Sequence, residues 1–352
     1  MDNVETKKKS NIRRNIIDIV FLLVVFGLTI YGVFHGENLE EVLEGLKQCD
    51  LVILVVPCVI CVLLFILLES VIMKYIFKTL GTKLRLMRAY LYSFVGFFFS
   101  CITPSASGGQ PAQIVFMRKD KLNVAHSTLV LLLITIGYKL VLVILGGITL
   151  IIRPKSIMDA VEPVEFWVWL GIVLNIIVIV ALFILVFMPA VAKWIIKKCI
   201  GFLNKIRILK DKEKWLHKTD DMMIKYEDAS KYLKDHKIVI FNVIILSILQ
   251  RLILFFITVI VYWSFHLRGT SIIDILMLQC LISVGADMLP LPGGMGITER
   301  LFLAMFAPTF GDLTLPAMIL SRGFSYYIQL LISAVMTVVA YILIFKKGRK
   351  KE

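Results

Sequence analysis

The sequence lacks the short motifs that mark nucleotide-binding and metal-dependent enzymes. It contains no G-x-x-x-x-G-K-[ST], no G-x-G-x-x-G after a strand and no H-E-x-x-H. Its six cysteines do not have the spacing of a disulfide framework or a zinc site. The five histidines fall near predicted helix ends or in loops. A buried Ser–His dyad around 105-SAS-107 is therefore not expected, and we expect no metal or cofactor.

Charge is scarce over long stretches of this chain. Of its 352 residues 59% are hydrophobic and 18% charged, and the mean hydropathy is +0.87. The runs 15–34, 166–188 and 238–263 are each long enough to cross a bilayer core. A soluble helical protein would not need so many consecutive apolar runs. The sequence predicts an all-α, polytopic integral membrane protein.

The net charge of +14 reflects topology rather than nucleic-acid binding. Most of the 39 Lys and Arg fall in five clusters, at residues 7–14, 74–88, 118–121, 193–237 and 346–351. Positive charge accumulates on the cytoplasmic side of membrane proteins. We therefore expect all five clusters, and both termini, to be cytoplasmic.

Two Pro/Gly-rich stretches, 103-TPSASGGQPA-112 and 290-PLPGGMGITER-300, interrupt apolar segments. Irregular backbone at membrane depth is tolerated only where protein covers it or where it lines a polar cavity. The apolar run 89–101 is too short to cross a bilayer. A re-entrant hairpin from the cytoplasm would keep the flanking basic clusters on one side, whereas a full crossing would separate them. We favour the hairpin.

The remaining apolar runs complete a topology of six full crossings and two re-entrant hairpins. The crossings are expected at 15–34, 51–77, 122–152, 166–188, 238–264 and 313–345, and the second hairpin at 271–306 with its break at 290–296. The two glycine pairs lie 185 residues apart (293 − 108). The same offset aligns half one (51–152) with half two (238–345). The hairpin of half one would enter the membrane from the cytoplasm, and that of half two from outside. This is an inverted repeat within a single membrane domain, 1–352, and such repeats occur in transporters.

Ionisable residues inside membrane helices usually face a partner or a polar path. Lys139 and Arg322 fall at similar depth in the two halves, near the two glycine turns. They could hold a phosphate, assisted by free backbone N–H groups. Alternatively, they could form structural ion pairs with Glu69, Asp287 or Glu299. Arg251 is expected to pair with Glu69.

The second break ends in Glu299, for which two roles are open. It could cap the half-helix that begins near Ile297, or act as a proton-coupling or gating carboxylate. The glycine pairs could provide turns with positive φ, or allow close helix approach.

The two breaks, in a chain of this size and hydrophobicity, resemble the lysylphosphatidylglycerol synthase transmembrane region, the flippase-like part of the multiple peptide resistance factor. The resemblance covers roughly residues 10–345, and P-x-P-G-G-x-G-x-x-E is its more specific element. It implies site roles for eight residues: Pro104, Gly108, Gly109, Pro292, Gly293, Gly294, Gly296 and Glu299.

The resemblance also implies a function. The family's membrane part moves aminoacylated phosphatidylglycerol between leaflets, while a separate soluble part transfers lysine from charged tRNA to the lipid. The printed sequence holds no segment large enough to be that soluble part, so we expect no lysyltransferase activity from it. The alternative, a phosphatidylglycerol lysyltransferase or its membrane subunit linked to resistance to cationic peptides, stays open. Membrane parts of this kind are also associated with polyprenyl-phosphate lipids.

The basic segment 189–237 is the largest predicted cytoplasmic part. Residues 191–209 alternate apolar and cationic side chains, as in a helix lying in the headgroup plane or in a small cytoplasmic subdomain. The segment could also recruit a separately encoded glycosyltransferase. A homodimer is left open, and no nucleic-acid partner is expected beyond the tRNA of a transferase.

Overall fold

The computed structural model describes residues 39–152, 155–205, 212–287 and 289–346, and these residues contain helices and connecting turns but no strand. The all-α prediction is confirmed for this part of the chain. The first half contains α2 (Leu39–Lys47), α3 (Leu51–Thr79), α4 (Leu86–Ile102), η1 (Pro104–Ala106), α5 (Gly109–Lys119) and α6 (Val124–Ile152). Then follow α7 (Lys155–Val161), η2 (Glu162–Val164), α8 (Glu165–Phe187), α9 (Pro189–Lys205) and α10 (Lys212–Asp235). The second half contains α11 (Lys237–Ser264), α12 (Ile272–Asp287), η3 (Pro292–Gly294), α13 (Ile297–Phe310), η4 (Gly311–Leu313), α14 (Thr314–Arg322), η5 (Gly323–Ile328), α15 (Gln329–Tyr341) and η6 (Ile342–Lys346).

Five helical stretches within these residues are long and apolar enough to cross a membrane. They are Leu51–Thr79, Val124–Ile152, Ile157–Phe187, Lys237–Ser264 and Pro292–Phe345. The first four correspond to predicted crossings, and the fifth joins the return arm of the second predicted hairpin to the last predicted crossing. The predicted crossing 15–34 lies outside the described residues.

The predicted crossing 313–345 is not one uniform α-helix. α14 ends at Arg322, and the six-residue turn η5 that follows has the wider hydrogen-bond pattern of a π-helix. Such turns interrupt α-helices and occur often at functional sites.

Each break separates two short helices that fold back on each other. We call α4–η1–α5 hairpin one and α12–η3–α13 hairpin two. α4 has 17 residues, or about 25 Å at 1.5 Å per residue. Its start lies beside the end of α5, because Arg88 Nη1 is 3.4 Å from Asp120 Oδ2. Hairpin one therefore returns to the end of the bundle from which it starts.

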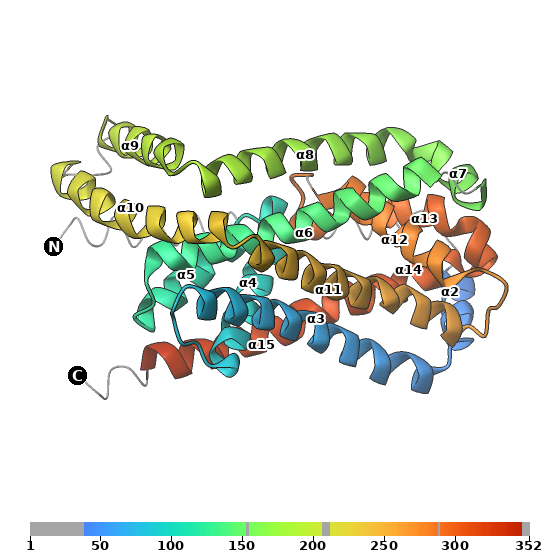
Figure 1. Ribbon diagram of the computed structural model, residues 1–352. Coiled ribbons are helices and arrows are strands. Elements are labelled where there is room, and N and C mark those ends of the chain that lie inside the picture. Colours follow the sequence, from blue (N-terminus) through green and yellow to red (C-terminus); the bar gives the residue numbers. More distant parts are fainter. Residues whose placement is uncertain (1–38, 153–154, 206–211, 288, 347–352) are drawn as a thin grey trace.

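The turns of the two hairpins touch inside the bundle. The Ser105 hydroxyl of η1 donates to the carbonyl of Leu289, 3.3 Å away, and Leu289 lies three residues before the start of η3. In Figure 1, α4 and α5 approach this point from one end of the molecule, and α12 and α13 approach it from the other. The two hairpins are thus opposed in the structure. Whether each is re-entrant in a membrane stays a prediction.

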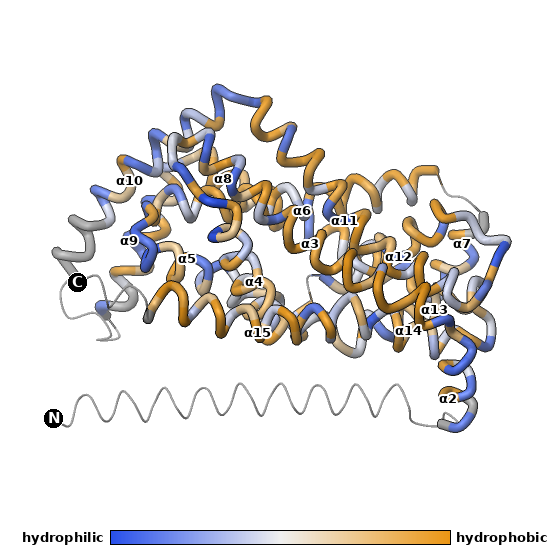
Figure 2. Tube along the Cα trace, turned by 90° about the horizontal axis from the view of Figure 1, so that it is seen from below, coloured by the Kyte–Doolittle hydropathy of each residue, from blue (hydrophilic) through white to orange (hydrophobic). Residues whose placement is uncertain are grey.

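Hydrophilic residues gather at the two ends of the bundle, with hydrophobic helices between them (Figure 2). One end carries α5, α9 and α10, and the other carries α2 and α7 (Figures 1 and 2). α9 and α10 pack against each other through Asp220, which contacts Lys193 and Lys197 at 2.7 and 3.1 Å. These two hydrogen-bonded ammonium groups lower the pKa of the Asp220 carboxyl. The described residues of the 189–237 segment therefore form two helices that pack against each other, and the exposed Trp194 leaves a membrane-surface role open.

Two large apolar cores fill the bundle, one around each hairpin. The first includes Phe255, Leu281 and Phe302, and packs around hairpin two. The second includes Phe77, Tyr92 and Leu129, and packs around hairpin one. Close van der Waals packing of these side chains stabilises the bundle around both hairpins. The polar groups described below lie between the two cores.

The helix bounds also match the predicted offset between the halves. α3 and α11 begin 186 residues apart (237 − 51) and end 185 apart (264 − 79). Gln250 of α11 donates to the carbonyl of Phe65 of α3 at 3.1 Å, and these two positions differ by 185. In an inverted repeat, equivalent residues near the pseudo-twofold axis contact each other. The repeat itself stays a prediction, now with matching helix bounds.

Candidate functional site

The two hairpin turns begin along the same backbone path, from Thr103 to Ala106 and from Leu291 to Gly294, but the glycine pairs do not occupy equivalent places. In η3 the residues after Pro292, Gly293 and Gly294, have φ of +59° and +65°. In η1 the residues after Pro104, Ser105 and Ala106, have φ of +49° and +54°. The prolines are 188 residues apart (292 − 104). The offset of 185 that superimposed Gly108 on Gly293 is therefore wrong by three residues at the turns.

Gly108 and Gly109 instead allow α4 and α5 to pack closely. Gly108 has φ of −82° and precedes α5. A Cβ on Gly109 would lie 2.1 Å from the Ser100 hydroxyl and 2.7 Å from the carbonyl oxygen of Gly96. Of the two roles open for glycine, close approach applies to this pair, while positive φ applies to Gly293, Gly294 and Gly296.

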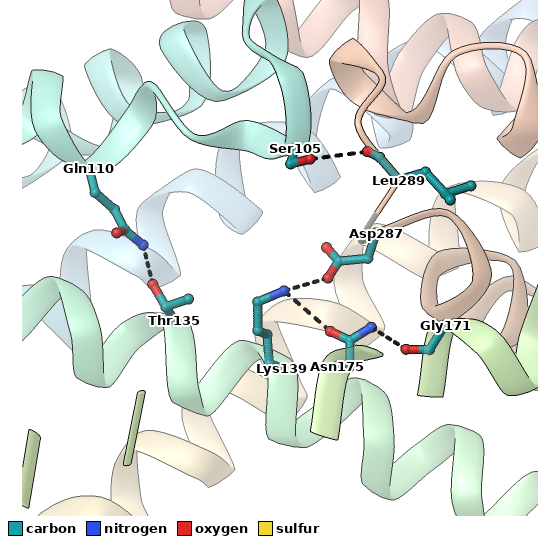
Figure 3. Close-up of polar contacts among 8 residues, drawn as sticks. All are labelled: Ser105, Gln110, Thr135, Lys139, Gly171, Asn175, Asp287 and Leu289. Carbon is teal, nitrogen blue, oxygen red and sulfur yellow. Dashed lines mark hydrogen bonds and ion pairs between the residues drawn. The ribbon is translucent and has the colours of Figure 1, made fainter. Parts of the chain in front are cut away.

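Lys139, in the middle of α6, is buried and paired. Its Nζ lies 2.6 Å from Asp287 Oδ2 and 3.2 Å from Asn175 Oδ1 (Figure 3). Asn175 is held in turn, because its Nδ2 donates to the carbonyl of Gly171 at 2.9 Å. The ion pair joins α6 to the last residue of α12, directly before the second turn. Asp287 was one of the three expected carboxylate partners.

Arg322 and Glu299 form the second buried ion pair. Arg322 Nε donates to Glu299 Oε1 at 2.8 Å, and its Nη2 donates to the carbonyl of Gly293 at 3.0 Å. The other carboxylate oxygen of Glu299 accepts from the backbone N–H of Gly296 at 2.7 Å. The capping role predicted for Glu299 is therefore confirmed. Arg322 holds both the turn and the half-helix that follows it.

Arg251, in the middle of α11, does not pair directly with Glu69. No carboxylate oxygen among the described residues lies within 4.0 Å of its nitrogens, and its Nε is buried without a hydrogen-bond partner there. Its guanidinium carbon lies 3.8 Å from the ring centroid of Tyr138, an aromatic contact that stabilises a cation. Glu69 instead accepts from Gln113 Nε2 at 3.1 Å. The expected Arg251–Glu69 ion pair is thus replaced by two separate contacts.

Two cavities, whose walls combine apolar surface with charged and polar side chains, flank the touching turns. The hairpin-two chamber, of about 220 Å³, is lined by Arg322, Gly293 and Gly294, among others. The hairpin-one chamber, of about 200 Å³, is lined by Lys139 and Glu69, among others. Residues common to both linings are Ser100, Ala106, Tyr138, Arg251 and Asp287.

The predicted site residues therefore gather where the two hairpins meet, but they play different parts. Lys139 and Arg322 line opposite chambers, and each holds a carboxylate. Their predicted role in holding phosphate stays a prediction. Tyr138 and Asn175 were missed, because an aromatic ring and an amide in apolar helices carry no signal of their contacts. The first turn also contributes Gln110, which donates to the Thr135 hydroxyl (Figure 3).

Comparison with known proteins adds one finding. A family model described as the lysylphosphatidylglycerol synthase TM region matches residues 15–333. No curated protein matches the chain. Since the match spans both hairpins, both chambers and nearly all of the chain, the protein belongs to the lysylphosphatidylglycerol synthase transmembrane-region family.

Proposed function

We propose that this chain carries a phospholipid with an anionic or aminoacylated headgroup between the leaflets of a bacterial cell membrane. The observation that supports this proposal is the pair of chambers with charged side chains in their walls, placed between two apolar cores where the two hairpin turns touch. A headgroup crossing a bilayer needs polar partners at the depth where lipid tails provide none. The acyl chains stay among the apolar outer faces of the helices.

Lys139 and Arg322 are the proposed headgroup cations. Each lies beside a chamber and already holds a carboxylate, Asp287 and Glu299 respectively. A phosphate that replaces the carboxylate keeps the cation paired, while the displaced carboxylate has to be protonated or to find another donor. Glu299 is the proposed gate, because it ties the second turn to Arg322 and would release that turn when the pair opens.

The proposed movement is alternating access in an inverted repeat. If hairpin one enters from the cytoplasm and hairpin two from outside, small displacements of their turns would open one chamber at a time. Headgroups with a phosphate satisfy the cations, so anionic or lysylated phosphatidylglycerol and polyprenyl-phosphate lipids all fit this chemistry.

Leaflet exchange in vesicles tests this proposal. The chain is reconstituted with fluorescent phosphatidylglycerol, and an impermeant reductant then bleaches only the outer leaflet. We expect protein-dependent exchange, and we expect Lys139→Ala and Arg322→Ala each to abolish it when equal amounts of folded protein are compared. Normal exchange in both variants would contradict the proposed headgroup site.

A double variant separates headgroup binding from simple structural pairing. In Lys139→Ala with Asp287→Asn, the unpaired buried carboxylate is removed along with the cation. If Lys139 only balances Asp287, exchange returns; if it holds the headgroup, exchange stays absent. A new aminoacylated phospholipid in cells expressing this chain alone would instead favour the lysyltransferase alternative.

A further inference from the structure

Arg251 differs from the other two central cations in having donors without protein partners. Lys139 and Arg322 each contact a carboxylate at 2.6 and 2.8 Å. Arg251 has no ion pair or hydrogen bond to any described residue, and its Nε is shielded from solvent. An arginine carries five N–H donors in a fixed planar fork. Leaving such donors unsatisfied in a buried site is costly.

The nearby carboxylates are already engaged elsewhere. Glu69 accepts from Gln113, and Asp287 accepts from Lys139. Tyr138 and Phe65 instead cover the guanidinium with ring centroids 3.8 and 5.2 Å from its central carbon. Aromatic faces stabilise the charge of a guanidinium but accept none of its in-plane hydrogen bonds. The planar edge of Arg251 is therefore open to an oxygen acceptor inside the chambers.

Arg251 also lies in the wall that the two chambers share. Its side chain lines both cavities, whereas Lys139 lines only the hairpin-one chamber and Arg322 only the hairpin-two chamber. Of the five described residues that line both chambers, Arg251 is the one cation, so an anion in either chamber can reach it.

We propose that Arg251 is the phosphate-binding centre shared by the two chambers. Its guanidinium binds the phosphate oxygens midway through transport. At the other two points of the path the phosphate is bound by Lys139 in one chamber and by Arg322 in the other. Guanidinium binds phosphate in a bidentate manner, which an ammonium group cannot reproduce. This inference rests on the proposed lipid transport, because it names the group that holds the headgroup midway.

Binding measurements on the purified full chain in detergent test the inference apart from transport. The probe is dioctanoyl phosphatidylglycerol, and dioctanoylglycerol is the matched lipid without phosphate. Glycerol phosphate and inorganic phosphate test whether the phosphate alone is enough. We expect Arg251→Gln to weaken binding of the phospholipid by about tenfold or more, the loss typical of a charge-assisted hydrogen bond. Arg251→Lys should restore only part of the affinity, and Arg268→Gln, an exposed cation, should have none of these effects.

The outcomes separate this inference from the proposed function. If the unmodified chain binds the phospholipid through Arg251 but exchanges none in vesicles, transport is refuted and the binding site stands. If the chain exchanges lipid and Arg251→Gln binds and exchanges it equally well, the site is refuted and transport stands. Equal binding of dioctanoylglycerol would also overturn the inference, because the phosphate would then contribute nothing. A lower Tm in Arg251→Gln, with the affinity of the folded protein unchanged, would assign Arg251 a structural role only.

Discussion

The turn of hairpin one, Pro104–Ala106, is exposed, whereas the turn of hairpin two, Pro292–Gly294, is largely enclosed. Each turn consists of a proline followed by two residues with positive φ. In the second turn these residues are glycines, and Arg322 and Glu299 hold the turn from both sides. In the first they are Ser105 and Ala106, which carry side chains in the left-handed region at a cost of about 1–2 kcal/mol each.

The supports of the second turn have no counterpart in the first. With the 188-residue offset of the turns, Arg322 corresponds to Ile134 and Glu299 to Pro111, and neither can form an ion pair. The first turn is held by local bonds instead. The Thr103 hydroxyl donates to the carbonyl of Phe99 at 2.6 Å and accepts from the N–H of Gly108 at 2.9 Å. A shared backbone path therefore does not imply shared anchoring, and we expect the first turn to move more easily.

The largest effect should follow from removal of the anchor of the second turn. Arg322→Leu leaves Glu299 buried without its cation, so we expect a loss of about 3–5 kcal/mol in the free energy of unfolding. Thermal unfolding of the detergent-solubilised chain measures the change. Addition of Glu299→Gln should recover part of the loss, while Arg268→Leu at an exposed site should change stability by less than about 0.5 kcal/mol. Equal losses in the two arginine variants would contradict the anchoring role.

A glycine substitution in the same turn should have the next largest effect. A Cβ on Gly293 would lie 1.9 Å from Cε2 of Tyr326, in addition to the strain of φ +59°. We expect Gly293→Ala to destabilise the protein by about 3 kcal/mol. Gly81→Ala is the matched control, since Gly81 has φ +73° in the turn that ends α3 and no atom within 4 Å of its Cβ position. It should cost only about 1 kcal/mol, and an equal cost for both would mean that Tyr326 does not enclose the turn.

The smallest effect should come from the exposed turn. Ala106 has φ +54°, so Ala106→Gly relieves left-handed strain but increases the freedom of the unfolded chain. We expect stability to rise by no more than about 1 kcal/mol. The same thermal measurement checks this, and a clear loss of stability would show that the Ala106 methyl group packs against the chamber.

The sequence predicted the elements of this fold well, because each depends on a local pattern. The apolar runs 51–77 and 238–264 became α3 and α11 with bounds within two residues, and both breaks interrupt helices where Pro and Gly cluster. Glu299 was placed correctly as a cap, since a carboxylate three residues into a helix is a local signal.

The contacts between distant segments could not be predicted in the same way. Lys139 and Asp287 are 148 residues apart, and no periodicity in the chain specifies which carboxylate meets which cation. The two turns were aligned incorrectly because Gly108-Gly109 has the same residue types as Gly293-Gly294. The residues whose backbone conformation matches that of Gly293 and Gly294 are Ser105 and Ala106. The first turn adopts positive φ without glycine, and sequence reasoning assigns that conformation to glycine first.

The central claim is that the two hairpins enter the membrane from opposite sides and meet around the two chambers. Single cysteines at positions 88 and 118, and at 270 and 312, are introduced into a chain whose six native cysteines are replaced by alanine and which still exchanges lipid. They are labelled with an impermeant maleimide in intact and in opened cells. The account predicts that 88 and 118 react only in opened cells, whereas 270 and 312 react in intact cells. Reaction of 88 and 118 from different sides would show that hairpin one crosses the membrane, and the account would be wrong.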